Sequence, residues 1–367
     1  IALGDAGAEV AVFSADGETD PAVATALAEL GVEVFAPKLG LESDPQAGAE
    51  GAVAAIDAAN AAGILDWGPE LLIDDGSHLV RLAHTERPGA LEALRAASEE
   101  TTSGVRPLIE MAAEGALRIP VIAVNDARTK SEFDNRIGTG QSCVFAIADL
   151  LDSDGRPGRG WGRDEDRGIF GTSWVVVGYG PVGVGVARFA AALGARITVV
   201  ERDPVRALQA LHDGFEASTL AAALPLADVA VSATGVWHTL SGDDLALLQP
   251  GAAVAVAGGI DDELALDELR ARGWEIDERG PHLATWRAPG ATGGPLVLAD
   301  GAGVNYTAGE GNPIEVMDLS FATQLSSLAR IAAGGDAVGV HVLDAAAERL
   351  VAAAALEAHG AATNPSG

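Results

Sequence analysis

The sequence contains a single cysteine, Cys143, among 367 residues. One cysteine excludes an intrachain disulfide and a zinc site built from several thiolates. Such low cysteine usage is typical of a reducing compartment, so we expect a cytoplasmic protein. His78 and His84 are six residues apart in a stretch with little acid, which does not match the spacing of a metal site, and no metal is predicted.

The sequence also lacks a long apolar run and an excess of basic residues. No apolar stretch approaches the roughly 20 residues that cross a bilayer. Lysine and arginine number 23 against 53 acidic residues, which gives a formal net charge of −30. This acidic balance argues against nucleic acids and anionic membranes as partners.

The chain has enough apolar residues, 48%, to bury a sizeable core, and its length predicts two domains. Short apolar runs alternate with alanine- and leucine-rich helical patterns, which predicts an α/β fold with mostly parallel sheets. Strands are expected at 9–14, 32–36, 71–76, 121–124, 227–235 and 252–259, with a strand, turn, helix and strand over 173–204. The other expected features are a mobile surface loop at 152–168, a long helix at 314–333 and a frayed tail at 357–367.

A glycine-rich turn follows an apolar strand near the middle of the chain. In VVVGYGPVGVG, Gly178, Gly180 and Gly183 have G-x-G-x-x-G spacing, with Val182 inside the turn. The first glycine allows the tight turn, the second lets a pyrophosphate approach the backbone, and the third lets the helix pack on the strand. The pattern predicts a Rossmann dinucleotide site; the alternative is a glycine-rich turn without a ligand.

Glu201 ends the strand that follows this helix. An acid there accepts hydrogen bonds from both hydroxyls of an adenosine ribose, which favours NAD over NADP. Arg202 comes next and is suited to a 2′-phosphate, so NADP is the alternative. We therefore predict NAD as the cofactor.

Lysine is rare in this chain, which has only Lys38 and Lys130. Lys130 lies in the polar stretch NDARTKSEFDN, four residues before Asp134. A partly buried lysine can exchange a proton with a substrate oxygen, whereas arginine stays charged. Taken alone, however, the spacing is more typical of an exposed ion pair one helical turn apart, which contributes little.

Several stretches together resemble S-adenosyl-L-homocysteine hydrolases: IDDGSHLVRLAHTERP, SEETTSGV, VNDARTKSEFDN, GYGPVGVG and VSATG occur in that family's order and near its spacing. The resemblance implies an α/β fold of two domains, with a Rossmann NAD-binding domain inserted into a doubly wound substrate-binding domain. By this resemblance the expected parts are a substrate domain of residues 1–125 and 314–342, hinges at 126–140 and 311–313, an NAD domain at 141–310 and a C-terminal segment at 343–367.

The resemblance implies redox-assisted chemistry on a nucleoside. In that family bound NAD oxidises the 3′-hydroxyl, a base removes the acidified 4′ hydrogen, the 5′ substituent leaves, water adds at C5′, and the 3′ alcohol is restored. Carried over, Lys130 and Asp134 act at the 3′-hydroxyl, and Asp75 carries protons near C4′ and C5′. The 2′ side of the ribose is assigned to Glu100 and Thr101. Further NAD contacts are assigned to Thr102, Ser103, Asn135, Thr234, Gly235 and Asn305.

The chain departs from the family pattern around the 5′ substituent and the base. Gly259 and Asn312 stand where the family has histidines, Thr139 where it has a cysteine, and His78 where it has an acid. The 3′-oxidation and 2′ sets are complete. We therefore predict the same elimination with water as the leaving group, as in the nucleoside dehydratases of angustmycin-type antibiotic pathways, with His78 as the acid and Asn312 in the substrate site.

Two other functions stay open at this stage. One is ordinary S-adenosylhomocysteine hydrolysis with the missing groups replaced by other residues. The other is a catalytically silent NAD-binding regulator, against which the complete set of Lys130, Asp134 and Asn135 argues. The expected partners are an adenine nucleoside and further copies of the chain, in a dimer or tetramer. His238 is expected to be a loop residue, and the acidic run 258–269 to begin a helix.

Overall fold

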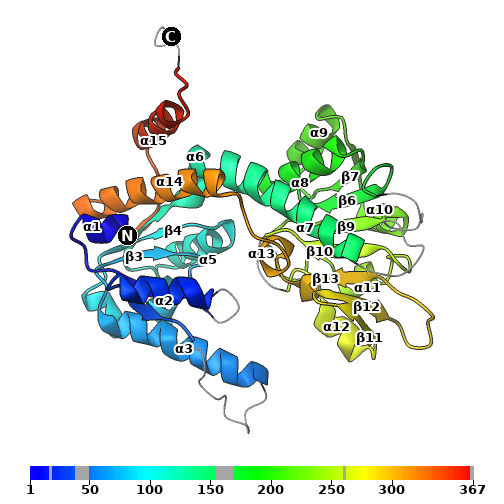
Figure 1. The fold of residues 1–367 in the computed structure, drawn as a ribbon, viewed down its shortest axis with the longest axis horizontal. Helices are drawn as coiled ribbons and strands as arrows, with labels where there is room; N and C mark the ends of the chain where they lie inside the picture. Colours follow the sequence, from blue (N-terminus) through cyan, green and yellow to red (C-terminus); the bar gives the residue numbers. More distant parts are fainter. Residues whose placement is uncertain (16–18, 38–48, 154–167, 259–261, 364–367) are drawn as a thin grey trace. The chain divides into compact units, whose positions relative to one another are not determined.

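The computed structural model describes residues 1–15, 19–37, 49–153, 168–258 and 262–363. The chain divides into two compact units (Figure 1). The first unit consists of Ile1–Val124 and Ser327–Val342, and the second of Asn125–Ser326 and Leu343–Gly367. Most of the expected loop at 152–168, and Gly259, lie outside the described residues.

The first unit contains a four-stranded parallel sheet in the order β14-β5-β4-β3. Its strands are β3 (Leu71–Asp74), β4 (Ala96–Glu99), β5 (Pro120–Ala123) and β14 (Gly339–Val342). β14 comes from near the end of the chain and pairs with β5, which comes before the second unit. The first unit is therefore built from two distant parts of the chain, with residues Asn125–Ser326 of the second unit inserted between them.

Helices connect the parallel strands of the first unit and bury their apolar sides on the sheet. Leu79, Val80 and Leu108 from these helices share one core with Leu72 and Val121 from the strands. The helices of the first unit are α1 (Ala2–Asp5), α2 (Pro21–Glu29), α3 (Ala49–Trp67), α4 (His78–Thr85), the 3₁₀ helix η2 (Pro88–Glu92) and α5 (Thr102–Ala113). Of these, α1 and α2 have no fully buried residue.

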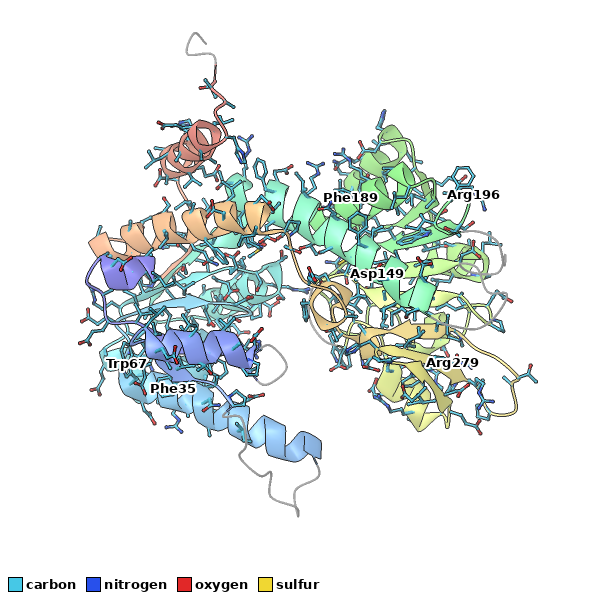
Figure 2. The ribbon with its side chains drawn as sticks, viewed as in Figure 1. Phe35, Trp67, Asp149, Phe189, Arg196 and Arg279 are labelled. Atoms are coloured by element: carbon cyan, nitrogen blue, oxygen red, sulfur yellow. The ribbon has the colours of Figure 1, made fainter. Side chains whose placement is uncertain are left out.

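The first two strands, β1 (Ala11–Phe13) and β2 (Glu33–Phe35), pair in parallel as a separate two-stranded sheet. Phe35 packs against the core of the first unit (Figure 2). A Cβ added at Gly63 of α3 would lie 2.9 Å from the Phe35 ring, so the absence of a side chain there lets the helix approach the strand.

The second unit contains an eight-stranded sheet in the order β11-β12-β13-β10-β9-β6-β7-β8. Only β12 runs antiparallel to its neighbours β11 and β13; the other pairs are parallel. The strands are β6 (Ser173–Val177), β7 (Arg196–Val200), β8 (Glu216–Ser218), β9 (Val229–Ser232), β10 (Ala253–Val256), β11 (Glu275–Gly280), β12 (Leu283–Arg287) and β13 (Leu296–Leu298).

Successive residues of a strand point to opposite sides of a sheet. Alternate residues of this sheet pack in two separate cores, so both of its faces are covered. Trp174 and Val176 of β6 pack in one core, which includes Phe189 at its edge (Figure 2), and Val175 and Val177 pack in the other. The helices are α7 (Gly140–Ser153), α8 (Pro181–Ala192), α9 (Pro204–His212), α10 (Leu220–Ala223), α11 (Gly242–Leu245), α12 (Leu266–Ala271), α13 (Val304–Thr307) and α15 (Ala345–Ala358). Helix α14 (Ile314–Ala333) contributes its first part to this unit.

The predicted α/β fold with an inserted Rossmann unit is confirmed, and each predicted strand is present. The strand predicted at 121–124 begins and ends one residue earlier, as β5, and the other strands predicted with bounds are shorter than expected. The helix predicted at 314–333 is α14, with the same bounds. The sequence did not indicate β4, the β11–β12 pair or α15. The hinge role of 126–140 and 311–313 stays a prediction.

Candidate active site

Lys130 lies where helix α6 (Arg128–Lys130) passes into a π-helical segment, η4 (Ser131–Thr139), which continues as α7. The wider turn of a π-helix directs residues four and five positions apart to the same side, and such segments are often found at functional sites. Here this geometry brings both Asp134 and Asn135 to the ammonium of Lys130.

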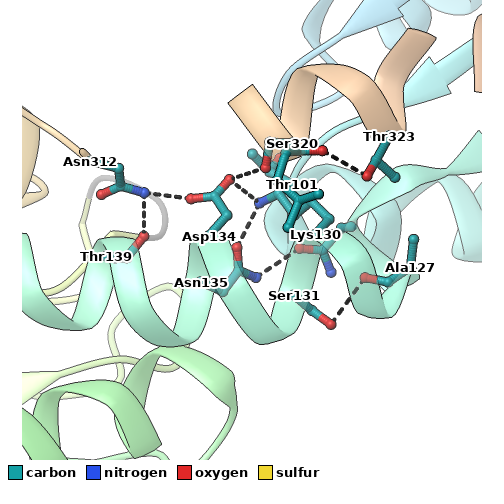
Figure 3. A network of polar contacts seen from close by, with 12 residues as sticks. Thr101, Ala127, Lys130, Ser131, Asp134, Asn135, Thr139, Asn312, Ser320 and Thr323 are labelled. Carbon is teal, nitrogen blue, oxygen red and sulfur yellow. Dashed lines mark hydrogen bonds and ion pairs between the residues drawn. The ribbon is translucent and has the colours of Figure 1, made fainter. Parts of the chain in front are cut away.

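The Lys130 ammonium lies at the centre of a buried polar network (Figure 3). Its Nζ is 3.1 Å from Asp134 Oδ2 and donates to Asn135 Oδ1 at 2.6 Å. Asn135 Nδ2 in turn donates to Asn125 Oδ1 at 2.9 Å. The side chains of Lys130 and Asp134 are only 5% and 6% exposed, so the exposed-pair interpretation is wrong.

Burial changes how much the Lys130–Asp134 ion pair contributes to the stability of the fold. Removing two charges from water costs about as much as their attraction returns, so a buried ion pair adds little net stability. A buried lysine held by a carboxylate and an amide is instead a candidate for proton exchange. The network therefore favours a chemical role for Lys130.

The glycine-rich turn has the geometry that a dinucleotide requires. Gly178 has φ +95°, and a Cβ there would lie 2.9 Å from the Ala233 carbonyl oxygen. A Cβ at Gly183 would lie 2.0 Å from the Gly178 carbonyl oxygen, so only glycine lets α8 pack this close to the turn. Gly180 precedes Pro181 and Val182 as the N-cap of α8, whose first amide groups carry the positive end of the helix dipole.

Acidic side chains hold the loops at the carboxyl ends of the neighbouring strands. Glu201, after β7, accepts hydrogen bonds from the Tyr179 amide at 2.7 Å and the Asp203 amide at 2.9 Å. Glu263 is fully buried and accepts from the amides of Thr234 and Gly235, after β9. Burial raises the pKa of Glu263.

The residues of the second unit fit a bound NAD. Asn305, in α13, is buried, and its side-chain Oδ1 has no hydrogen-bond partner among the described residues. A buried acceptor without a donor is costly, so a ligand that carries an amide donor, such as a nicotinamide, would satisfy it. Together with the glycine turn and Glu201, Asn305 makes this unit a suitable dinucleotide carrier.

In the first unit, the stretch Asp74–His78 contains two neighbouring acids, Asp74 and Asp75, in different surroundings. Asp74 is buried and caps α4, because its carboxylate accepts from the amides of Leu79 at 3.4 Å and Val80 at 2.8 Å. Asp75 and His78 are exposed. A Cβ at Gly76 would lie 2.8 Å from His78 Nε2, so the imidazole lies against the turn that carries Asp75.

A buried acid that the sequence analysis did not single out, Glu99, holds this turn. Gly76 and Ser77 both have positive φ, +76° and +56°, and their amides point to the same carboxylate. Both amides donate to the Glu99 carboxylate at 2.9 Å. Glu99 also accepts from the Thr101 amide at 2.9 Å and hydroxyl at 2.8 Å.

The other predicted residues of the first unit lie next to Glu99 in sequence. Glu100 is buried, and its amide donates to the Asp74 carbonyl oxygen at 3.0 Å. Thr101 caps α5, Thr102 is exposed, and the Ser103 hydroxyl donates to Thr101 Oγ1 at 3.3 Å. Their assignment to the ribose and to NAD stays a prediction.

Glu99 gives a testable pH dependence of stability. Burial, helped by the nearby Asp74 carboxylate, raises the pKa of Glu99 from 4.5 to about 8, and burial raises that of Asp74 to about 6. The folded state then holds a proton that the unfolded state releases, so the free energy of unfolding falls as pH rises towards 8. Between pH 6 and 8 most of this fall belongs to Glu99.

We expect Glu99→Gln to flatten the stability profile between pH 6 and 8, because glutamine does not titrate. The slope lost is at most about 1.4 kcal/mol per pH unit. Urea unfolding at several pH values measures it, with Glu92→Gln, an exposed glutamate of the same unit, as the control. Equal slopes for Glu99→Gln and the unchanged protein would contradict this role.

Two further expectations concern loops of the second unit. His238 lies in a loop, where its ring stacks on Trp237 and its Nε2 is 3.0 Å from Asp267 Oδ1. The acidic run was expected to begin a helix, and Asp267 and Glu268 do lie in the first turn of α12. Glu263 does not, since it holds the Thr234 loop instead.

No helix among the described residues is long and apolar enough to cross a membrane.

Comparison with known proteins agrees with this geometry. Residues 159–311 match the profile of the S-adenosyl-L-homocysteine hydrolase NAD-binding domain. The chain is 39% identical over 327 residues to an adenosylhomocysteinase of Thermotoga maritima, covering 89% of this chain and 74% of that protein. It is 37% identical over 358 residues to an S-inosyl-L-homocysteine hydrolase of Methanopyrus kandleri, covering 96% and 78%. The matched domain assigns NAD as the cofactor, and the chain belongs to the S-adenosyl-L-homocysteine hydrolase family.

Proposed function

We propose that this enzyme oxidises the 3′-hydroxyl of a purine nucleoside, removes the 4′ hydrogen and eliminates the 5′ substituent, with water as the favoured leaving group. The buried contact of Lys130 with Asp134 and Asn135, on the unit that carries the glycine turn, is the observation that supports it most. A catalytically silent regulator would have no use for a desolvated lysine of this kind.

Lys130 is suited to the first step because its ammonium can pass a proton to the Asp134 carboxylate, 3.1 Å away, and the neutral amine can then take the proton of the 3′-hydroxyl as the C3′ hydrogen departs. Asp134 keeps the ammonium in place, and Asn135 fixes its direction. When bound, NAD would supply the hydride acceptor for C3′ and the source of the hydride that restores the alcohol. Gly180, Glu201, Thr234 and Asn305 would hold it.

The 3′ ketone makes the 4′ hydrogen acidic. We assign the Asp75 carboxylate as the base that removes it. Asp74 is less suited, because its carboxylate is used in capping α4. When the C5′–O bond breaks, His78 would give a proton to the departing hydroxide. Glu99 would hold the turn that carries both groups, and Glu100 and Thr101 would contact the 2′ side of the ribose.

Two leaving groups have support of different kinds. The relatives that the chain resembles are named as hydrolases of homocysteine adducts, which supports homocysteine as the 5′ leaving group and water as the group added at C5′. The loss of two family-pattern histidines, at Gly259 and Asn312, supports elimination of water without addition. The names of the relatives include both adenosine and inosine adducts, so the base of the substrate is adenine or hypoxanthine in this proposal.

A reaction in deuterium oxide, followed by NMR, separates the two. The panel consists of adenosine, inosine, S-adenosylhomocysteine and S-inosylhomocysteine. We expect deuterium at C4′ in recovered substrate and in any hydrolysis product, and vinyl signals of a 4′,5′-ene, whose C4′ carries no hydrogen, from a free nucleoside. Rapid homocysteine release with adenosine or inosine as the stable product would make the enzyme a hydrolase instead. Neither deuterium at C4′ nor a 4′,5′-ene from any of them would overturn both versions.

A further inference from the structure

The Asp134 carboxylate is held from three directions within the second unit. One oxygen, Oδ2, is 3.1 Å from Lys130 Nζ and accepts from the Ser320 hydroxyl of α14 at 2.8 Å. The other oxygen, Oδ1, accepts from the side-chain amide of Asn312 (Figure 3). Asp134 and Ser320 are both buried, so each donor acts at short range with little screening by solvent.

The Asn312 amide is itself oriented by two further residues. Its Nδ2 donates to Thr139 Oγ1 at 3.0 Å as well as to Asp134, and its Oδ1 accepts from the Ser142 hydroxyl at 2.9 Å. An amide has two N–H donors and one carbonyl acceptor, so both donors are used and the acceptor is engaged. The amide can therefore face Asp134 in only one way round.

The backbone is shaped to admit this amide. Gly138 lies in the π-helical segment, and a Cβ there would come within 3.0 Å of Asn312 Cγ and Nδ2. Any side chain at position 138 would push the amide away from Asp134 by a few tenths of an ångström. Asn312 is 178 residues from Asp134 in the sequence, so this contact is a property of the fold of the unit.

We propose that Asn312, oriented by Thr139 and Ser142, is a positioning residue that holds Asp134 and, through it, the Lys130 ammonium in the reactive geometry. This role rests on the proposed oxidation of a 3′-hydroxyl. It differs from the expected contact of Asn312 with the substrate, because the hydrogen-bonding groups of its side chain are engaged within the protein. Removing the amide lets the Asp134 carboxylate rotate, and the Lys130 ammonium follows it.

The scarcity of lysine allows a direct test. With lysine labelled at Cε and Nζ, the protein gives two side-chain signals, from Lys38 and Lys130. We expect Asn312→Ala to move the Lys130 signal and to leave that of Lys38 in place. The initial rate of NAD reduction by the nucleoside that reacts with the unchanged protein should fall about 10- to 100-fold, as expected for loss of one hydrogen bond to a charged group.

Gly138→Ala should act in the same direction with a smaller effect, because it displaces the amide without removing it. Ser131→Ala is the matched control, since the Ser131 hydroxyl donates to the Ala127 carbonyl oxygen on the same stretch of helix and is not part of the network. An unmoved Lys130 signal in Asn312→Ala would overturn the proposal. An unchanged rate in that variant, with an active parent, would overturn the positioning role alone. If none of the nucleosides tested leads to reduction of NAD by the unchanged protein, the proposed function is overturned, and this role with it.

Discussion

Lys130→Arg is expected to leave NAD bound but to slow its reduction by a nucleoside by about 10²- to 10⁴-fold, the usual contribution of a positioned acid or base. Arginine keeps the positive charge beside Asp134 but does not give up its proton. The variant therefore separates charge from proton exchange. Because the interaction matters as the C3′ hydrogen departs, we expect the loss in rate more than in substrate affinity.

The near-ultraviolet absorbance of the reduced nicotinamide measures this half-reaction in a single turnover. Lys130→Gln serves as the comparison, since it lacks both the charge and the exchangeable proton. We expect it to be at least as slow as the arginine variant. An arginine variant as fast as the unchanged protein would leave Lys130 with a purely electrostatic role.

Gly180→Ala is expected to fold normally and yet to bind NAD at least about 100-fold more weakly, because the second glycine of the turn is where a pyrophosphate approaches the backbone. In the protein itself the added Cβ would meet no atom closer than Arg206 Nη1 at 3.6 Å. The φ of Gly180 is −76°, which alanine adopts without strain. The loss of NAD affinity should therefore come from a clash of the added methyl group with the cofactor, and not from damage to the fold.

Titration calorimetry with NAD, on protein stripped of its nucleotide, measures the effect, and thermal unfolding without NAD is the control for folding. Gly183→Ala is the contrasting variant. Its Cβ would lie 2.0 Å from the Gly178 carbonyl oxygen, so we expect it to damage the turn even without NAD. Unchanged NAD affinity in Gly180→Ala would mean that the dinucleotide does not pass this turn.

The parts of the fold that the sequence predicted are those with a local signal. Strand β6, before the glycine turn, is apolar from Trp174 to Val177, and the apolar pattern of α14 repeats over the whole helix. Strand β4 is Ala-Ala-Ser-Glu, with no β-branched or aromatic residue, so its pattern is too weak to predict. It is a strand because β3 and β5 pair with it on both sides.

The candidate site shows the same division. The spacing of Lys130 and Asp134 was visible, but burial and the π-helical turn decide whether the pair is exposed or functional, and neither can be read from spacing. Glu99 and Glu263 act on turns 23 and 29 residues away in the chain. An acid beside other acids gives no sequence signal for such a contact, which depends on two loops meeting at one end of a sheet.

The central claim is that this protein oxidises a nucleoside at C3′ with bound NAD. Mixing the NAD-loaded protein with adenosine, inosine, S-adenosylhomocysteine and S-inosylhomocysteine, each beside its 3′-deoxy counterpart, tests it most directly. We predict that at least one of the four produces the near-ultraviolet absorbance of reduced nicotinamide, and that its 3′-deoxy counterpart produces none. No absorbance change with any of the four, or an equal change with a 3′-deoxy compound, would contradict the claim.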